Sequence, residues 1–258
     1  MDGKAVSGLL DSRTVVVTGG SRGIGAAICV ELAAHGAQVV VNYRASGDAA
    51  AAVVSEIESA GGTAIAVQAD VEDGAAAREL VDAALSEYGS LDAIVNNAYP
   101  GFEGGDIGDV DWATYRDSMN SIAGGAIHMV KAALPNMRNR KSGSIINIGT
   151  TSLSSMNFQQ TPYIVGKGAL LALTRGLARD LGPDNIRVNL VSPGTTWVDR
   201  TRPQPDDFAM EPRSQTPMGR LPNASEVAGA VVFFASDLSA FITGVHVPVC
   251  GGMVMNGG

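Results

Sequence analysis

A tyrosine and a lysine four residues apart, Tyr163 and Lys167, could carry out proton-transfer chemistry. Side chains at positions i and i+4 are neighbours on one helix face, and Pro162 just ahead of the pair suits a helix start. An ammonium beside a phenol lowers the cost of forming phenolate, so the pair could serve as a proton donor. The same spacing occurs by chance in many helices, so the interpretation depends on the rest of the chain.

A glycine-rich turn near the start of the chain is the second feature with chemical potential. Gly19, Gly23 and Gly25 follow a β-branched run at 14–18 and precede a helical pattern at 26–35. A helix N-terminus offers free N–H groups and a dipole that favours an anion, and glycines let the backbone approach a pyrophosphate closely. We therefore expect a dinucleotide here. The spacing is G-x-x-x-G-x-G rather than G-x-G-x-x-G, and the alternative is an ordinary turn.

Strand-like and helix-like stretches alternate along the whole chain. Further strands are expected at 38–43, 63–67, 93–95, 144–148, 186–191 and 245–249. Further helices are expected at 49–60, 75–88, 111–138 and 224–235, together with the helix that carries Tyr163 and Lys167. The glycine pair at 124–125 and Pro135 weaken the continuity expected of the helix at 111–138. The alternation predicts an α/β fold, namely a Rossmann-like doubly wound parallel sheet of seven strands flanked by helices, in a single domain over 1–258.

The segment at 195–221 does not continue this alternation of strands and helices. It is rich in proline, carries mixed charges and shows no periodicity. Long irregular segments inside compact domains often cover a binding site, so we expect a substrate lid. A plain surface connection is the alternative.

Composition excludes several classes of function. The net charge of −8 argues against a nucleic-acid or anionic-membrane surface. Cys29 and Cys250 lie in apolar runs, as expected of buried thiols, and the histidines have no metal-ligand spacing, so no metal site is expected. The first residues do not resemble a signal peptide, and no apolar run is long enough for a membrane span. We therefore expect a cytoplasmic protein.

Several motifs occur together in the order found in the short-chain dehydrogenase/reductase family. They are TGGSRGIG at 18–25, Asn96-Asn97-Ala98, Asn120, Tyr163-x-x-x-Lys167, Ser192-Pro193-Gly194, Met218-Gly219-Arg220 and Ile242-Thr243-Gly244. The chain resembles this family over nearly its whole length, and most of all its 3-oxoacyl-carrier-protein reductase type. The resemblance implies an oxidoreductase acting on a small-molecule ketone or alcohol, including a carrier-bound one. It also implies a homotetramer built by pairing of the long helices and of the C-terminal strand regions.

The end of the second strand indicates which nicotinamide cofactor to expect. NAD-binding enzymes usually place an acid there, but this chain has Asn42-Tyr43-Arg44. Arg44 and Arg22 could hold a 2′-phosphate, so we predict NADP(H); the alternative is two ordinary surface arginines. By resemblance, Asp70-Val71 borders the adenine and Asn97-Ala98 lines the cofactor near its ribose. The predicted cofactor-binding residues are Gly19, Ser21, Arg22, Gly23, Ile24, Gly25, Asn42, Tyr43, Arg44, Asp70, Val71, Asn97, Ala98, Tyr163, Lys167, Pro193, Gly194 and Thr196.

The resemblance also implies a catalytic tetrad. Tyr163 would protonate the carbonyl oxygen as hydride arrives, and Lys167 would hold the nicotinamide ribose and favour tyrosinate. Asn120 would support the site geometry and a water that leads protons to Lys167; a helix-kinking amide is a compatible alternative. The family has a serine about thirteen residues before the tyrosine, where this chain has Thr150, whose hydroxyl can donate the same hydrogen bond. Ser152 is the substitute if the loop is offset.

Other departures from the family pattern point to an unusual substrate pocket. Tyr99 stands where the family usually has glycine, and Thr196 and Val198, with Trp197 between them, replace the usual residues after Gly194. Large side chains that line the pocket, or only pack the loops, are Tyr99, Phe102, Trp197, Phe208 and Met210. Two alternatives to a ketoreductase of acyl thioesters therefore stay open: a tailoring reductase or dehydrogenase of a bulky or polycyclic secondary metabolite, and a non-catalytic NADP-binding scaffold.

Overall fold

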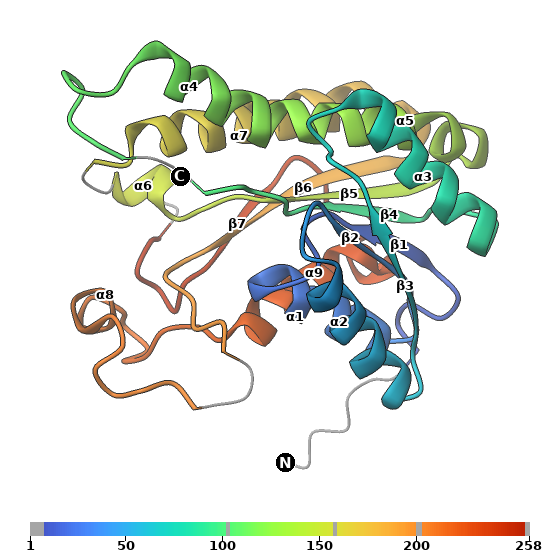
Figure 1. The fold of residues 1–258 in the computed structure, drawn as a ribbon, viewed down its shortest axis with the longest axis horizontal. Helices are drawn as coiled ribbons and strands as arrows, with labels where there is room; N and C mark the ends of the chain where they lie inside the picture. The colour runs from blue at the N-terminus through green and yellow to red at the C-terminus, as the bar shows by residue number, and fades with distance from the viewer. Residues whose placement is uncertain (1–7, 102–103, 157–158, 200–202, 256–258) are drawn as a thin grey trace.

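Seven parallel strands form one sheet, as the sequence predicts (Figure 1). The computed structural model describes residues 8–101, 104–156, 159–199 and 203–255. The strands lie in the order β3-β2-β1-β4-β5-β6-β7. Their bounds are β1 (Thr14–Val17), β2 (Gln38–Tyr43), β3 (Thr63–Gln68), β4 (Ala93–Asn96), β5 (Gly143–Ile148), β6 (Ile186–Pro193) and β7 (His246–Val249). This confirms the doubly wound α/β fold.

Helices cover both faces of the sheet (Figure 1). One face carries α1 (Gly23–Ala34), α2 (Gly47–Ser59) and α9 (Ala224–Ala235), and the other carries α3 (Gly74–Tyr88), α4 (Trp112–Met119), α5 (Gly125–Arg140) and α7 (Thr161–Leu181). Successive side chains of a strand point to opposite faces. In β1, Val15 and Val17 accordingly join the core cluster under α1 and α9, while Val16 joins the cluster under α3 and α5. Burial on both faces explains why the strand sequences are continuously apolar.

The order of the strands reverses beside β1. The chain builds β1, β2 and β3 outward in one direction, and β4 then returns to the other side of β1. The loops that leave the carboxyl ends of β1 and β4 therefore diverge. In open α/β sheets this crevice is where ligands bind.

The helical segment expected at 111–138 differs in its interior. The structure has α4, then a π-helical turn η1 (Asn120–Gly124), then α5, in one unbroken run to Arg140 with Pro135 inside α5. A π turn takes in an additional residue, so it changes the direction of the side chains around it. The short elements α6 (Ser152–Ser155), α8 (Met210–Ser214), η2 (Gly182–Asp184) and η3 (Asp237–Ser239) are not predicted, because they are too short to produce a periodic pattern.

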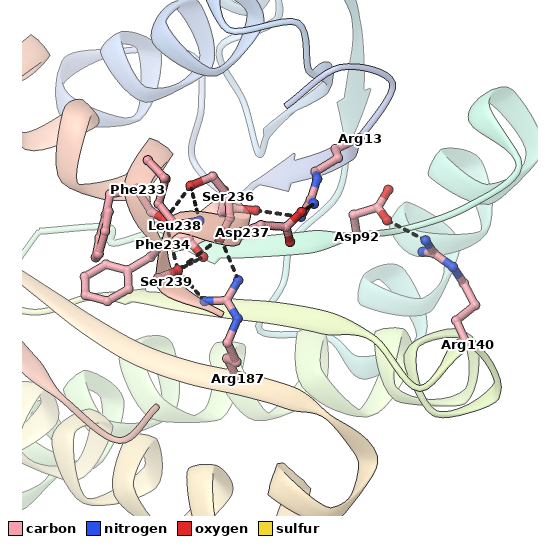
Figure 2. A network of polar contacts seen from close by, with 11 residues as sticks. Arg13, Asp92, Arg140, Arg187, Phe233, Phe234, Ser236, Asp237, Leu238 and Ser239 are labelled. Carbon is pink, nitrogen blue, oxygen red and sulfur yellow. Dashed lines mark hydrogen bonds and ion pairs between the residues drawn. The ribbon is translucent and has the colours of Figure 1, made fainter. Parts of the chain in front are cut away.

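A polar network ties the amino ends of the strands to the end of α9 (Figure 2). Arg13, next to the start of β1, donates to Asp237 at 2.6 Å. Arg187, at the start of β6, donates to the Ser239 hydroxyl at 2.6 Å and to the Ser236 carbonyl at 3.3 Å. Arginines placed this way satisfy carbonyls that a helix end leaves without partners. The network holds the edge of the sheet opposite the crevice.

Within the described ranges, no helix has the length and apolar character that a bilayer crossing requires.

Candidate active site

A cleft of about 430 Å³ lies at the carboxyl edge of the sheet. It is lined from the glycine turn, the ends of β2 to β6, and α7. The predicted residues that line it are Gly19, Ser21, Arg22, Ile24, Gly25, Asn42, Tyr43, Arg44, Asp70, Val71, Asn97, Ala98, Thr150, Tyr163, Lys167, Pro193 and Gly194. Among the described residues, Gly23, Asn120 and Thr196 were also predicted for the site but do not line this cleft.

The glycine turn has the geometry of an anion cradle. A Cβ at Gly25 would collide with the Gly19 carbonyl and lie 2.5 Å from Asn97 Nδ2, so only glycine fits there. Gly23 contributes through its backbone, whose φ of +58° lies in the left-handed region. Arg22 occupies the N-cap of α1 without a side-chain hydrogen bond to the helix among the described residues. The first N–H groups of α1 therefore stay available to a pyrophosphate, and the residues present fit a dinucleotide.

Asn97 braces the glycine turn as well as lining the cleft. Its Nδ2 donates to the carbonyls of Thr18 at 2.9 Å and Gly19 at 3.2 Å. Its backbone N–H and that of Ala98 both donate to the Thr18 hydroxyl at 2.9 Å. The end of β4 is thereby fixed to the end of β1, which sets the width of the crevice at its base.

Lys167 is buried at the floor of the cleft. The residue is only 3 % exposed, and its Nζ donates a hydrogen bond to the Ile148 carbonyl at 2.6 Å. Burial lowers the pKa of Lys167 to about 8. Nζ lies 5.8 Å from the centre of the Tyr163 ring. The ammonium is therefore close enough to favour negative charge on the neighbouring phenol.

Tyr163 lies beside Thr150, as the thirteen-residue spacing suggested. Burial raises the pKa of Tyr163, and a hydrogen bond with the Thr150 side chain partly offsets this rise. Thr150 is buried, and its hydroxyl also accepts a hydrogen bond from the Ser152 N–H at 3.2 Å. The Ser152 hydroxyl donates instead to Gln160 Oε1 at 3.2 Å. The structure thus brings the Thr150 side chain into hydrogen-bond contact with the tyrosine.

Asn120 lies at the start of the π turn, and its side chain is exposed. The next residue, Ser121, is buried and lines the cleft. The Asn120 carbonyl accepts a hydrogen bond from the Gly125 N–H, the i+5 pairing of a π turn. Because this turn rotates the helix by an additional residue, the side chain that faces the cleft is that of Ser121.

A cavity of about 10 Å³ adjoins the cleft beneath Lys167. Its lining includes Lys167, Ser121 and Asn96, and it has about the volume that one water molecule needs. Asn96 Nδ2 donates to Asn147 Oδ1 at 2.8 Å, whereas its buried Oδ1 has no hydrogen-bond partner in the described part of the chain. The lining of this cavity therefore includes Asn96 and Ser121, whereas Asn120 does not contribute to it.

Tyr99 contacts Tyr163 directly. The two ring centres are 5.1 Å apart, and Lys167 Nζ lies 5.6 Å from the centre of the Tyr99 ring. Burial raises the pKa of Tyr99, and Tyr163 raises it further. Tyr99 lines the cleft, so a tyrosine in place of the glycine that the resemblance leads us to expect narrows the space next to Tyr163.

The segment at 195–221 contributes little to the described cleft. Val198 lines it, whereas Trp197 packs edge-on against Phe208 with ring centres 4.7 Å apart, and Met210 is exposed. The Trp197 N–H donates to the Pro222 carbonyl at 2.9 Å, which fastens the start of the segment to the approach to α9. The Thr196 hydroxyl donates to the Gly194 carbonyl at 2.8 Å. Phe102, also predicted for the pocket, lies outside the described residues, as do 200–202 of the segment.

The sequence reasoning missed several residues that line the cleft, notably Glu72, Ser121 and Pro100. Glu72 directly follows the predicted Asp70-Val71 pair in the sequence. Its position in the same loop was therefore a signal that it could also line the cleft. Ser121 had no signal, since periodicity does not reveal a π turn.

Comparison with known proteins identifies the family. The model for enoyl-(acyl carrier protein) reductases matches residues 19–254. The 3-oxoacyl-[acyl-carrier-protein] reductase FabG of Staphylococcus epidermidis is 35 % identical over 248 residues, covering 95 % of this chain and 100 % of the relative. The chain belongs to the short-chain dehydrogenase/reductase family. As a family member it is a dehydrogenase/reductase that acts on CH–OH or C=O groups.

Two further similarities bear on the cofactor of this dehydrogenase/reductase. The L-rhamnose 1-dehydrogenase (NAD(P)(+)) of Azotobacter vinelandii is 38 % identical over 258 residues, covering 96 % of this chain and 99 % of the relative. The crystal structure of a short chain dehydrogenase from Burkholderia cenocepacia in complex with NADP has a TM-score of 0.84 and 36 % identity, covering 95 % of this chain and 98 % of that one. Nicotinamide cofactors are thus common to its relatives.

Proposed function

We propose that this enzyme is an NADP(H)-dependent ketoreductase that reduces a carbonyl group, such as that of a 3-oxoacyl thioester, with Tyr163 as the general acid. The observation that carries the proposal is the buried contact of Tyr163 with Thr150 and Lys167 in the same cleft that the glycine turn lines. The nicotinamide cofactor, when bound, supplies the hydride. The similarity to 3-oxoacyl-[acyl-carrier-protein] reductases supports the substrate class.

The residues of the chain have separate tasks in this reduction. Burial raises the pKa of Tyr163, so at neutral pH the residue is a phenol that can release its proton to a carbonyl oxygen. Thr150 hydrogen-bonds that phenol and fixes the direction of its O–H. With a pKa of about 8, Lys167 is mostly ammonium at pH 7 and stabilises the phenolate that forms. A water in the cavity beside Asn96 and Ser121 would return a proton through Lys167.

The choice of NADP(H) rests on the adenosine end of the cleft. Arg22 and Arg44 line that end, and the sequence Asn42-Tyr43-Arg44 at the end of β2 contains no acidic residue. Arginine forms charge-assisted hydrogen bonds with phosphate. The NADP complex of the Burkholderia relative supports the same cofactor.

Removal of the Tyr163 hydroxyl tests the proposal. In Tyr163→Phe, ketone-dependent NADPH oxidation should fall by about 10³-fold or more, while the dissociation constant for NADPH, measured by fluorescence titration, should change less than about threefold. Tyr88→Phe is the matched control, because it removes a buried phenol oxygen from α3, away from the cleft. Unchanged turnover in Tyr163→Phe would refute the assigned acid.

A bulky ketone is the second candidate substrate, and Tyr99 is the observation that favours it. An aromatic ring 5.1 Å from that of Tyr163 offers a stacking surface to a flat or polycyclic substrate. A panel of 3-oxoacyl thioesters and polycyclic ketones separates the candidates: turnover of the polycyclic ketones alone selects the tailoring enzyme. Turnover of any ketone eliminates the non-catalytic scaffold.

We further propose that the enzyme is a cytoplasmic homotetramer of single-domain subunits with residues 195–221 as its substrate lid. The tetramer follows from the family resemblance. Light scattering should give a mass of about four times the 26.4 kDa chain, and a mass near that of one chain would overturn the proposed tetramer.

Limited proteolysis with and without NADPH and ketone tests the proposed lid, which should become protected from cleavage only when both are bound.

A further inference from the structure

Two carboxylates face Arg44 across the adenosine end of the cleft. Arg44 Nη1 lies 3.8 Å from Asp70 Oδ2 and 3.9 Å from Glu72 Oε1, and all three residues line the cleft. These distances are those of ion pairs rather than hydrogen bonds, and all three side chains are partly exposed. The guanidinium is therefore shared between two carboxylates and keeps its donors available.

The loop that carries the two carboxylates is fixed in place. The Glu72 N–H donates to Asp70 Oδ1 at 3.1 Å, and Asp73 caps α3 by accepting from the Ala75 N–H at 2.7 Å. On the other side, the Arg44 carbonyl accepts from Gln68 Nε2 at 2.8 Å. Both backbones are anchored, so the ion pairs change only through rotation of the side chains.

Glu72 stands in an unfavourable charge environment that Arg44 relieves. Burial raises the pKa of the Glu72 carboxyl, Asp70 and Asp117 raise it further, and Arg44 lowers it. A phosphate that drew Arg44 away would leave Glu72 among carboxylates and would add negative charge nearby. The local charges therefore oppose a 2′-phosphate, although the arginines taken alone attract it.

We propose that Glu72 is a selectivity residue that competes with the cofactor 2′-phosphate for Arg44, so that the cleft accepts the unphosphorylated nucleotide alongside the phosphorylated one. The inference rests on the proposed function, because it concerns the same cofactor site. Glu72 lowers the affinity for the 2′-phosphate through Arg44 and leaves the rest of the nucleotide unaffected.

Calorimetric titration of the full-length enzyme with 2′,5′-ADP and with 5′-ADP tests the competition without any turnover. In Glu72→Gln, the affinity for 2′,5′-ADP should rise about fivefold at 0.1 M salt, while that for 5′-ADP stays within about twofold. Glu79→Gln is the matched control, because it removes the same charge from an exposed position of α3 that does not line the cleft. It should change neither affinity by more than about twofold.

The same titration in an Arg44→Gln background tests whether Glu72 acts on 2′-phosphate binding through Arg44. In that background, the gain in affinity for 2′,5′-ADP from Glu72→Gln should fall below about twofold, because the guanidinium for which Glu72 and the 2′-phosphate compete is absent. An unchanged or weaker affinity of Glu72→Gln for 2′,5′-ADP overturns the inference, and so does a full gain that survives in the Arg44→Gln background. If the unmodified enzyme binds neither probe, the proposed cofactor site itself is refuted; if it binds both and the variants behave alike, only the selectivity role is refuted.

Discussion

Replacement of the buried Lys167 by methionine should slow ketone reduction about 10²-fold or more and at the same time stabilise the fold at neutral pH. Methionine has a similar length and needs no solvation, so it can occupy the same space. Burial lowers the pKa of Lys167 from 10.5 to about 8, and each pKa unit corresponds to about 1.36 kcal/mol, so the buried charge costs about 3 kcal/mol at pH 7.

The interactions of the ammonium offset part of this cost. Loss of the hydrogen bond to the Ile148 carbonyl removes about 1 kcal/mol. The rings of Tyr99 and Tyr163 lie 5.6 and 5.8 Å from Nζ, near the outer limit of a cation–π contact, so each contributes about 0.5 kcal/mol. The net gain expected for Lys167→Met at pH 7 is about 1 kcal/mol, or about 2–4 °C in melting temperature for a chain of this size.

The gain in stability of Lys167→Met at pH 7 should become a loss at high pH. Since the folded pKa lies below the unfolded one, the unfolded chain binds more protons between about pH 8 and 10.5, and the stability of the unmodified enzyme rises across that window. Between pH 7 and pH 10 the advantage of Lys167→Met should shrink by about 2.5 kcal/mol, which makes the variant the less stable protein at pH 10.

Differential scanning calorimetry of both proteins at pH 7 and pH 10, without nucleotide, measures the reversal. Lys131→Met is the control, because it removes an exposed lysine of α5 and should show no reversal. NADPH oxidation on the same samples should fall about 10²-fold or more in Lys167→Met alone. A stability difference between the unmodified enzyme and Lys167→Met that is the same at both pH values would refute the reasoning that Lys167 is held as a desolvated charge.

Three further substitutions probe separate parts of the molecule. Gly25→Ala should weaken NADPH binding more than about tenfold by fluorescence titration, because its Cβ would collide with the carbonyl oxygen of the glycine turn; wild-type affinity would show that the turn does not hold the cofactor. Thr150→Val should lower the rate of ketone reduction about tenfold or more and move its high-pH limb to higher pH, because the hydrogen bond that lowers the pKa of Tyr163 is lost, whereas Thr150→Ser should keep the profile. Arg187→Leu should reduce the free energy of unfolding by about 2 kcal/mol without changing the KM for ketone, because it removes the two hydrogen bonds that Arg187 donates to Ser236 and Ser239 at the edge opposite the cleft. Unchanged chemical denaturation would show that the network in Figure 2 is not stabilising.

The sequence by itself was sufficient for the sheet, for the glycine turn and for the place of Tyr163 in the cleft. The strands are continuously apolar because both their faces are buried, and this signal is local and strong. The turn at Gly19 to Gly25 was recognisable because strand, glycines and helix are consecutive in the chain. Thr150 could be placed because the family resemblance expects a hydroxyl about thirteen residues before Tyr163.

Only the tertiary structure decided which side chains meet across elements. Ser121 faces the cleft in place of Asn120 because a π turn rotates the helix, and hydrophobic periodicity does not record a single added residue. The approach of Glu72 to Arg44 depends on the pairing of β2 with β3, which brings two loop ends together that are far apart along the chain. The direction of a side chain at a π turn depends on how the folded chain packs. The same holds for an ion pair between loops that two paired strands bring together. Neither can therefore be predicted from the sequence alone.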